Sequence, residues 1–334
     1  MYELLGICLA LSALLALNAF ASVLAEGVWR VVSQRVSKWP AAARARLLFA
    51  LRVSPSALAA TVVFALVIPS YLLNEPMNTG ETVGKKLLML ASLSAAGVLL
   101  ACWRIARTWL ATRRLARDWM RHAEPVHVEG LRLQAHGIRH RFPVIAVIGV
   151  IRPRLFIATQ IFDALTSEEL AAALAHERGH VAARDNLKRA VLQAGQDALL
   201  LAPLGRTLRR EWQRESELAA DEFAASSGPA AALDLASAIV KISRLTPGGA
   251  RPTMPAGAHL LGDEGDGLSR RVRNLLSLAS APESVRASCR PHVSSMLTKA
   301  LWLGLCAAVA LMLTHPTVLK VTHDAIERIV ASLT

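Results

Sequence analysis

Long apolar runs alternate with strongly polar segments along this chain, and the apolar runs have the length of membrane spans. An α-helix needs about 20 residues to cross a bilayer, and four runs approach that length: 4–25, 55–73, 87–103 and 300–319. The first run contains no charged residue and is followed by Glu26 rather than by a small-residue cleavage site, so we predict a retained span and not a signal peptide. The fourth run is the weakest, because His315 and Pro316 interrupt it.

The distribution of charge predicts the topology of these spans. Hydrophobic residues make up 53% of the 334 residues and charged residues 19%, and the net charge is +13. Arginines crowd the segment 26–54 and follow residue 103, whereas the short segment after the second span contains Glu75 and Glu81. The positive-inside rule therefore predicts a multi-pass protein of a bacterial-type inner membrane, with 26–54 and 104–297 cytoplasmic and both termini outside. No nucleic-acid recognition motif accompanies the arginines, so we assign them to anionic lipid and not to direct nucleic-acid binding.

The segment 104–297 alternates between helical and strand patterns. A helix is predicted to run on from the third span to about residue 121. Apolar alternation and β-branched runs predict a strand pair at 126–136 and further strands at 143–150 and 155–158. Such strands either hold a substrate backbone by strand addition or only pack under the following helix. Further helices are expected at 187–204, 206–225, 229–245 and 268–278, and a glycine-rich flexible loop at 246–267.

One short motif carries most of the chemical information. His176-Glu177-Arg178-Gly179-His180 is H-E-x-x-H, the pattern of zinc-protease helices. A helix start signal precedes it at Thr166, with acidic residues in the first turn. Residues four apart share a helix face, so His176 and His180 can bind one cation, and Glu177, about 100° round the helix, can reach a water beside it. We predict that both histidines are zinc ligands and that Glu177 is the catalytic general base.

A second motif supplies the remaining ligand. Glu217 is the candidate third ligand, although three further glutamates are near enough to compete: Glu211, Glu215 and Glu222. Asp221 follows one turn later, where it can accept a hydrogen bond from a ligating histidine or remain a solvated carboxylate. Three protein ligands leave a zinc position open for hydrolysis. An oxyanion-stabilising arginine is not singled out among the four that lie nearby: Arg206, Arg209, Arg210 and Arg214.

Several ordered runs resemble the membrane metallopeptidases of the BlaR/MecR antirepressor family. The runs are GVIRPR at 149–154, LTSEEL at 165–170, LAHERGH at 174–180, RDN at 184–186, RRE at 209–211 and ESELAADE at 215–222. The resemblance implies four transmembrane helices with a gluzincin-type α+β zinc domain inserted between the third and fourth. It also implies Zn²⁺ held by His176, His180 and Glu217, and a cytoplasmic repressor, or the chain itself, as substrate. Those sensors carry a penicillin-binding domain after the fourth span. Here only residues 320–334 follow, expected as a short external tail, so we do not expect direct β-lactam sensing.

Two other functions remain open. The HtpX/CAAX group of membrane zinc endopeptidases shares both motifs and would imply membrane-protein quality control or processing. A membrane signalling scaffold with a structural zinc ion is the non-enzymatic alternative, although structural sites usually use four Cys and His ligands. The expected partners are the lipid bilayer, a protein or peptide substrate and a separate sensor protein. Control is expected to act through that sensor or the spans, with 246–267 as a gate or self-cleavage site.

Overall fold

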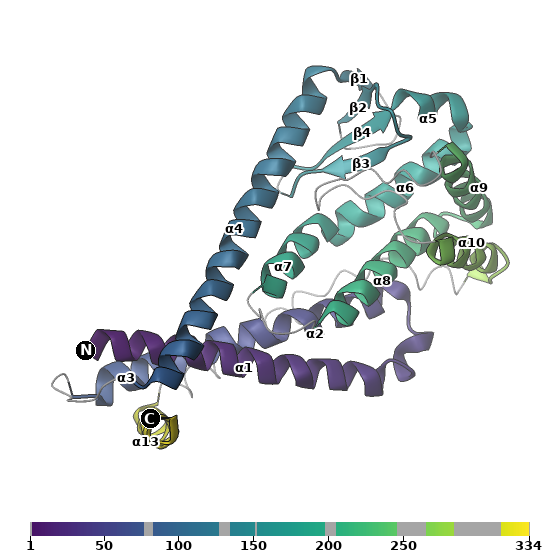
Figure 1. Ribbon diagram of the computed structural model, residues 1–334. Helices are drawn as coiled ribbons and strands as arrows, with labels where there is room; N and C mark the ends of the chain where they lie inside the picture. Colours follow the sequence, from purple (N-terminus) through teal and green to yellow (C-terminus); the bar gives the residue numbers. More distant parts are fainter. Residues whose placement is uncertain are drawn as a thin grey trace.

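The computed structural model describes residues 2–76, 83–126, 134–150, 152–197, 205–245, 265–283 and 315–333, and these form a mainly helical protein with one small sheet (Figure 1). Among the described residues, three helices are long and apolar enough to cross a membrane. They are α1 (Tyr2–Val32), the continuous helix Ala41–Asn74 and α4 (Lys85–Arg121). They match the first three predicted spans, and α4 extends well past its apolar part as expected. Most of the predicted fourth span, 300–319, lies outside the described residues.

The helix Ala41–Asn74 contains one π-helical turn. It consists of α2 (Ala41–Val62), a π-helical turn η2 (Val63–Val67) and α3 (Ile68–Asn74). Pro69 comes two residues after the end of this turn. Proline has no N–H, and its ring crowds the carbonyl of the residue four positions earlier. A wider turn is one of the ways in which a helix accommodates such a residue, so the helix continues through the proline without ending.

The described end of the chain is helical. The residues predicted as a short tail, 320–334, fall almost entirely within α13 (Pro316–Leu333). Ser70 of α3 donates a 2.7 Å hydrogen bond from Oγ to the carbonyl oxygen of Leu319. Ile326 packs against the apolar cluster that α1, the second helix and α4 share, which includes Leu5 and Leu87. The proline that was expected to weaken a span stands at the first position of this helix, where its missing N–H removes no helical hydrogen bond.

The sheet has the strand order β1-β2-β4-β3. Its strands are β1 (Glu124–Val126), β2 (Ala135–Ile138), β3 (Ile145–Ile148) and β4 (Arg154–Ala158). β1 and β3 are antiparallel to their neighbours, whereas β2 and β4 are parallel. The strands predicted at 143–150 and 155–158 are confirmed as β3 and β4. Of the strand pair predicted at 126–136, residues 127–133 lie outside the described residues, and β1 and β2 pair on either side of them. β3 is the edge strand on the side of α6 (Figure 1).

The remaining described helices include α6 and α9, which share a core with the sheet. Their bounds are η1 (Arg35–Lys38), between α1 and α2, and then α5 (Thr159–Ala164), α6 (Ser167–Ala183), α7 (Asp185–Asp197), α8 (Arg206–Ala225), α9 (Pro229–Leu245) and α10 (Gly265–Ala279). The predicted helices 206–225 and 229–245 are confirmed to the residue, and α10 starts three residues before the predicted 268. The core combines β3 and β4 residues with Leu174 of α6 and Ile242 of α9. Most of the loop predicted at 246–267 lies outside the described residues.

Helix α8 is attached to the start of α2 at two points. Glu222 accepts the backbone N–H of Ala41 through both carboxylate oxygens, at 3.2 and 3.0 Å. Arg44 donates from Nε to Oε2 of Glu215 at 2.7 Å, and its Nη2 lies 2.6 Å from the same oxygen. Glu215 is buried, so this ion pair is shielded from solvent. The position of α8 is therefore tied to the second membrane-length helix.

Candidate metal centre

Helix α6 is fixed at both of its ends. Thr166 and Glu169 form a reciprocal capping box at its start, in which each side chain accepts the other's backbone N–H. The buried Glu169 also accepts hydrogen bonds from Ser237 at 2.6 Å and Lys241 at 2.7 Å, both on α9. Arg184 ends the helix in a left-handed conformation, with a φ of 54°. This frame holds the predicted zinc motif rigidly between α8, α9 and the sheet.

Gly179, inside the motif, allows α6 and α8 to approach closely. A Cβ atom at this position would lie 3.1 Å from Cα of Ala220 and 3.3 Å from Cβ of Phe223. Contacts this short are tighter than side chains normally make, so a larger residue would push the two helices apart. The glycine thus brings the two motifs within reach of each other.

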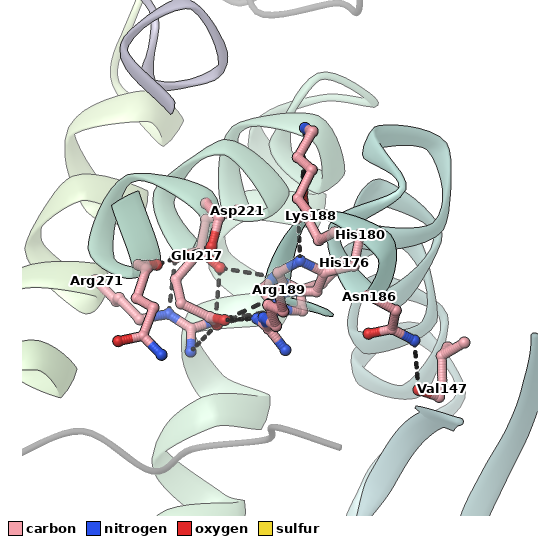
Figure 2. Close-up of polar contacts among 12 residues, drawn as sticks. Val147, His176, His180, Asn186, Lys188, Arg189, Glu217, Asp221 and Arg271 are labelled. Atoms are coloured by element: carbon pink, nitrogen blue, oxygen red, sulfur yellow. Dashed lines mark hydrogen bonds and ion pairs between the residues drawn. The ribbon is translucent and has the colours of Figure 1, made fainter. Parts of the chain in front are cut away.

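The two histidines and Glu217 converge at this crossing (Figure 2). Nε2 of His176 lies 3.2 Å from Nε2 of His180 and 3.6 Å from Oε2 of Glu217. Nε2 of His180 lies 3.5 Å from Oε1 of Glu217, and one ligand atom from each of the three residues lies within 4.8 Å of the others. Zinc–ligand bonds of about 2.0–2.1 Å place tetrahedral ligand atoms about 3.3–3.5 Å apart. The spacing and the donor set both fit a zinc ion.

The competing glutamates have other partners. Glu215 and Glu222 bind α2, as described above, and Glu211 accepts a 3.0 Å hydrogen bond from Arg214 on the outer side of α8. Of the four glutamates considered from the sequence, the structure brings only Glu217 to the histidines.

Each histidine has a carboxylate at its far nitrogen. Nδ1 of His180 is 2.8 Å from Oδ2 of Asp185 in a hydrogen bond. Nδ1 of His176 is 2.9 Å from Oδ1 of Asp221, a contact that is close but less well aligned. Such carboxylates fix the tautomer and orientation of a ligating imidazole. The sequence predicted this position for Asp221 but not for Asp185, which reaches the site only because Arg184 turns the chain there.

The acidic surroundings change how the histidines titrate. Burial opposes the charging of His180, but the Glu217 carboxylate and the hydrogen bond to Asp185 outweigh it and raise the pKa to about 10. Burial likewise opposes charging of His176, and its contacts with Asp221 and Glu217 raise its pKa in spite of this. A metal ion entering the site would therefore displace protons.

Two arginines complete the polar network, and neither was predicted from the sequence. Arg271 of α10 donates to both oxygens of Asp221, from Nη2 at 2.7 Å and from Nε at 2.9 Å, and its Nη1 lies 3.2 Å from Oε2 of Glu217 (Figure 2). Arg189 of α7 donates from Nη2 to Oε1 of Glu217 at 3.1 Å. Burial would raise the pKa of Asp221, but the charge of Arg271 holds it below its ordinary value. The arginines neutralise an otherwise acidic pocket.

Glu177 differs from the other acids in the site. Its side chain is buried, and its Oε1 has no hydrogen-bond partner among the described residues. Burial raises its pKa above the ordinary value, although the neighbouring histidines oppose this. A cavity of about 20 Å³ adjoins it, with an apolar wall and four polar side chains: His176, Glu177, Glu217 and Arg271. This volume has room for about one water molecule.

The comparison with known protein families agrees with this geometry. The family model described as BlaR1 peptidase M56 matches residues 20–275. The chain belongs to this family. The matched part contains both motifs and the three membrane-length helices except for the start of α1, so the chain is a membrane-associated metallopeptidase. No curated protein matches the chain.

The edge strand of the metallopeptidase lies beside this site. Val144 accepts a hydrogen bond from the backbone N–H of Ala158 at 2.7 Å. In an antiparallel pair, residues that bond the neighbouring strand alternate with residues whose backbone groups face away. Ile145 and Val147 thus direct their N–H and C=O groups away from β4, but both residues are buried, at 0% and 5% exposure. Asn186 donates from Nδ2 to the carbonyl oxygen of Val147 at 3.0 Å (Figure 2). The same nitrogen donates to the carbonyl oxygen of Gly149 at 3.1 Å. The edge is covered at that end, and Ile145 lines the cavity.

Proposed function

We propose that this metallopeptidase is a zinc-dependent endopeptidase in which His176, His180 and Glu217 bind the metal and Glu177 acts as general base. The observation that carries the proposal is the buried Glu177 carboxylate, which has an oxygen without a described partner, beside a set of zinc-like ligands and a cavity of water size. Two histidines and one carboxylate leave a coordination position open, whereas structural zinc usually has four Cys or His ligands. This ligand set favours an enzyme over a non-catalytic scaffold.

The side chains of the site divide the work of peptide hydrolysis. A zinc ion held by the three ligands would supply Lewis acidity, which lowers the pKa of a water and polarises a peptide carbonyl. Glu177 would accept a proton from a water bound in the adjoining cavity and donate it to the leaving amine. A carboxyl group whose pKa is raised by burial is better suited to both steps than an ordinary one. Asp185 and Asp221 would keep the two imidazoles oriented through their Nδ1 atoms.

The edge strand supports binding of an extended peptide. A substrate strand would pair with the outward N–H and C=O groups of Ile145, next to the cavity and Glu177. Because Ile145 is fully buried, the segments that cover this edge would have to move aside first. Asn186 occupies the carbonyls of Val147 and Gly149 and would end the pairing there. The main chain of the substrate would thus give affinity, and the apolar wall of the cavity would contact a side chain near the cleaved bond.

The proposed biological setting follows from charge and family. The excess of Arg around 26–54 and after residue 103 favours a cytoplasmic position for 104–297 and external termini. The substrate would then be a cytoplasmic protein, such as a transcriptional repressor, or the chain itself. A separate sensor protein would supply the signal.

The test is a comparison of the purified wild-type chain with Glu177→Gln, both loaded with zinc in detergent micelles. The variant should keep its zinc and lose at least about 100-fold in peptide cleavage, because a general base typically contributes 10²–10⁴-fold. Cleavage is measured on an unstructured protein and on the chain itself, with the fragments mapped by mass spectrometry. Glu168→Gln, an exposed change on the same helix, is the matched control and should keep full activity. Equal cleavage by wild type and Glu177→Gln would refute the assignment.

A further inference from the structure

A second group of metal-ligating side chains lies far from the candidate metal centre. It joins Glu75, the residue that follows α3, to His323 and Glu327 of α13. Nε2 of His323 is 3.3 Å from Oε1 of Glu327 and 3.9 Å from Oε2 of Glu75. One ligand atom from each of the three residues lies within 4.8 Å of the others. The side chains of His323 and Glu75 are only 10% and 7% exposed, so two of the three groups are largely shielded from solvent.

The distances fit a shared cation better than hydrogen bonds. A hydrogen bond between nitrogen and oxygen is normally 2.7–3.2 Å long, and both contacts of His323 exceed that range. Both carboxylate oxygens approach Nε2 of His323, which carries at most one proton and so can donate only one hydrogen bond. Ligand atoms around a zinc ion lie about 3.3–3.5 Å apart. The His323–Glu327 separation meets this range, and the His323–Glu75 separation exceeds it by a few tenths of an ångström. The candidate metal centre of the same chain has separations of 3.2, 3.5 and 3.6 Å.

Local structure presents the three side chains together. His323 and Glu327 are four residues apart on one helix and so share a face. The hydrogen bond between Ser70 and the Leu319 carbonyl fixes α13 against α3, which brings that face to Glu75. Figure 1 shows α13 beside the end of α3 and away from α6 and α8. The cluster thus joins two segments that are remote in the sequence.

We propose that Glu75, His323 and Glu327 form a second divalent-cation site, with a preference for zinc-like metals. One imidazole and two carboxylates are the ligand types that zinc accepts, and an imidazole disfavours magnesium or calcium, which prefer all-oxygen sites. Glu327 is 58% exposed, so the cation can enter from solvent and keep water ligands.

The position of this site gives it a mechanical consequence. The helix Ala41–Asn74 has 34 residues and is therefore about 50 Å long. Its far end precedes Glu75, and its first residue, Ala41, holds Glu222 of α8. A cation at the second site fastens α13 to the helix that also positions α8. This second site lies at the end of the helix Ala41–Asn74 that is opposite to the end held by α8 and the candidate metal centre.

The experiment measures zinc content in the full-length chain. Protein in detergent micelles is stripped with a chelator, given Zn²⁺, desalted and analysed for metal. Wild type should retain one more zinc ion per chain than His323→Ala. Loss of a residue that only hydrogen-bonds a ligand already weakens metal binding by about 10–100-fold. Loss of the ligand His323 itself should therefore weaken zinc binding at this site by more than about tenfold. The exposed residue His315, immediately before α13, supplies the matched control, and His315→Ala should retain the wild-type zinc content.

Further variants distinguish this site from the candidate metal centre at His176, His180 and Glu217. His176→Ala should lose a different zinc ion and still bind the one that His323→Ala loses. In the His176→Ala background, zinc should raise the unfolding temperature by binding the folded state, and adding His323→Ala should remove that shift. If His323→Ala does not fold, Glu327→Gln, which changes an exposed side chain, takes its place. Equal zinc content in wild type, His323→Ala and Glu327→Gln would overturn the proposal, whether or not the metallopeptidase centre binds zinc.

Discussion

Arg271 offers the sharpest test of how the buried charges of the metal centre are balanced. Its guanidinium donates two hydrogen bonds to Asp221 and contacts Glu217. Arg271→Met keeps much of the aliphatic stem but removes the charge. The Asp221 side chain is 0% exposed, so water cannot replace the lost partner. We therefore expect the metal-free protein to be strongly destabilised.

The magnitude follows from the burial of the pair. Removing one partner of a buried ion pair costs about 3–5 kcal/mol. For a domain of about 150–250 residues, a range that includes the segment 104–297, each kcal/mol lowers the unfolding temperature by about 2–4 °C, so the expected loss is about 6–20 °C. The pKa of Asp221 is lowered in the folded state, so the stabilisation should be complete at pH 7. It should fade only as the pH falls below the ordinary aspartate pKa of about 3.9.

Zinc should reduce this penalty, because a divalent cation beside Glu217 supplies the positive charge that the variant lacks. Thermal unfolding is followed at one scan rate, with chelator and with zinc, and the zinc-induced gain should be larger for Arg271→Met than for wild type. Arg270→Met is the matched control: it makes the same change in a neighbouring side chain that is 52% exposed, and it should cost no more than about 1 kcal/mol. A metal-free Arg271→Met protein that unfolds within about 2 °C of wild type would refute the reasoning.

Two further substitutions test the parts that position the ligands. Asp185→Asn should weaken zinc binding by about 10–100-fold, because Asp185 orients His180; competition with a chelator measures it, and unchanged affinity would contradict the role. Gly179→Ala should cost about 1–3 kcal/mol, because the new Cβ would lie 3.1 Å from Cα of Ala220. Thermal unfolding measures that loss, and equal or higher stability would show that α6 and α8 can separate freely.

The sequence predicts those parts of the site that depend on short-range helical geometry. The four-residue spacing of His176 and His180 places them on one face, and the same spacing relates Glu217 to Asp221. The helices that carry them were predicted from capping and periodicity, and α8 and α9 agree to the residue. Edge strand β3 was also predicted, but its order in the sheet was not, because a local pattern does not say which strands become neighbours.

The residues that the sequence did not reveal reach the site through tertiary packing. Asp185 depends on a single left-handed residue, Arg184, that reverses the chain after α6. A non-glycine residue rarely adopts this conformation, so the pattern gave no signal for it. The position of Arg271 depends on how α10 packs against α8. Helix α10 is separated from α9 by residues 246–264, which lie outside the described residues, so no local pattern indicated this packing. Several arginines closer in sequence were considered for a catalytic role, yet this distant one contacts Asp221.

The glutamates of α8 explain why one helix can serve both the metal centre and the membrane helix. At 100° per residue, Asp221 lies about 40° from Glu217 around the helix axis, whereas Glu215 and Glu222 lie about 160° and 140° away. The first pair faces the histidines of α6, and the second pair faces α2, where it binds Arg44 and the N–H of Ala41. The proposed ligand thus sits between two attachment points on the opposite side of its own helix. Any tilt or shift of α2 acts on α8 through both points, so the ligand geometry and the second membrane-length helix cannot move independently.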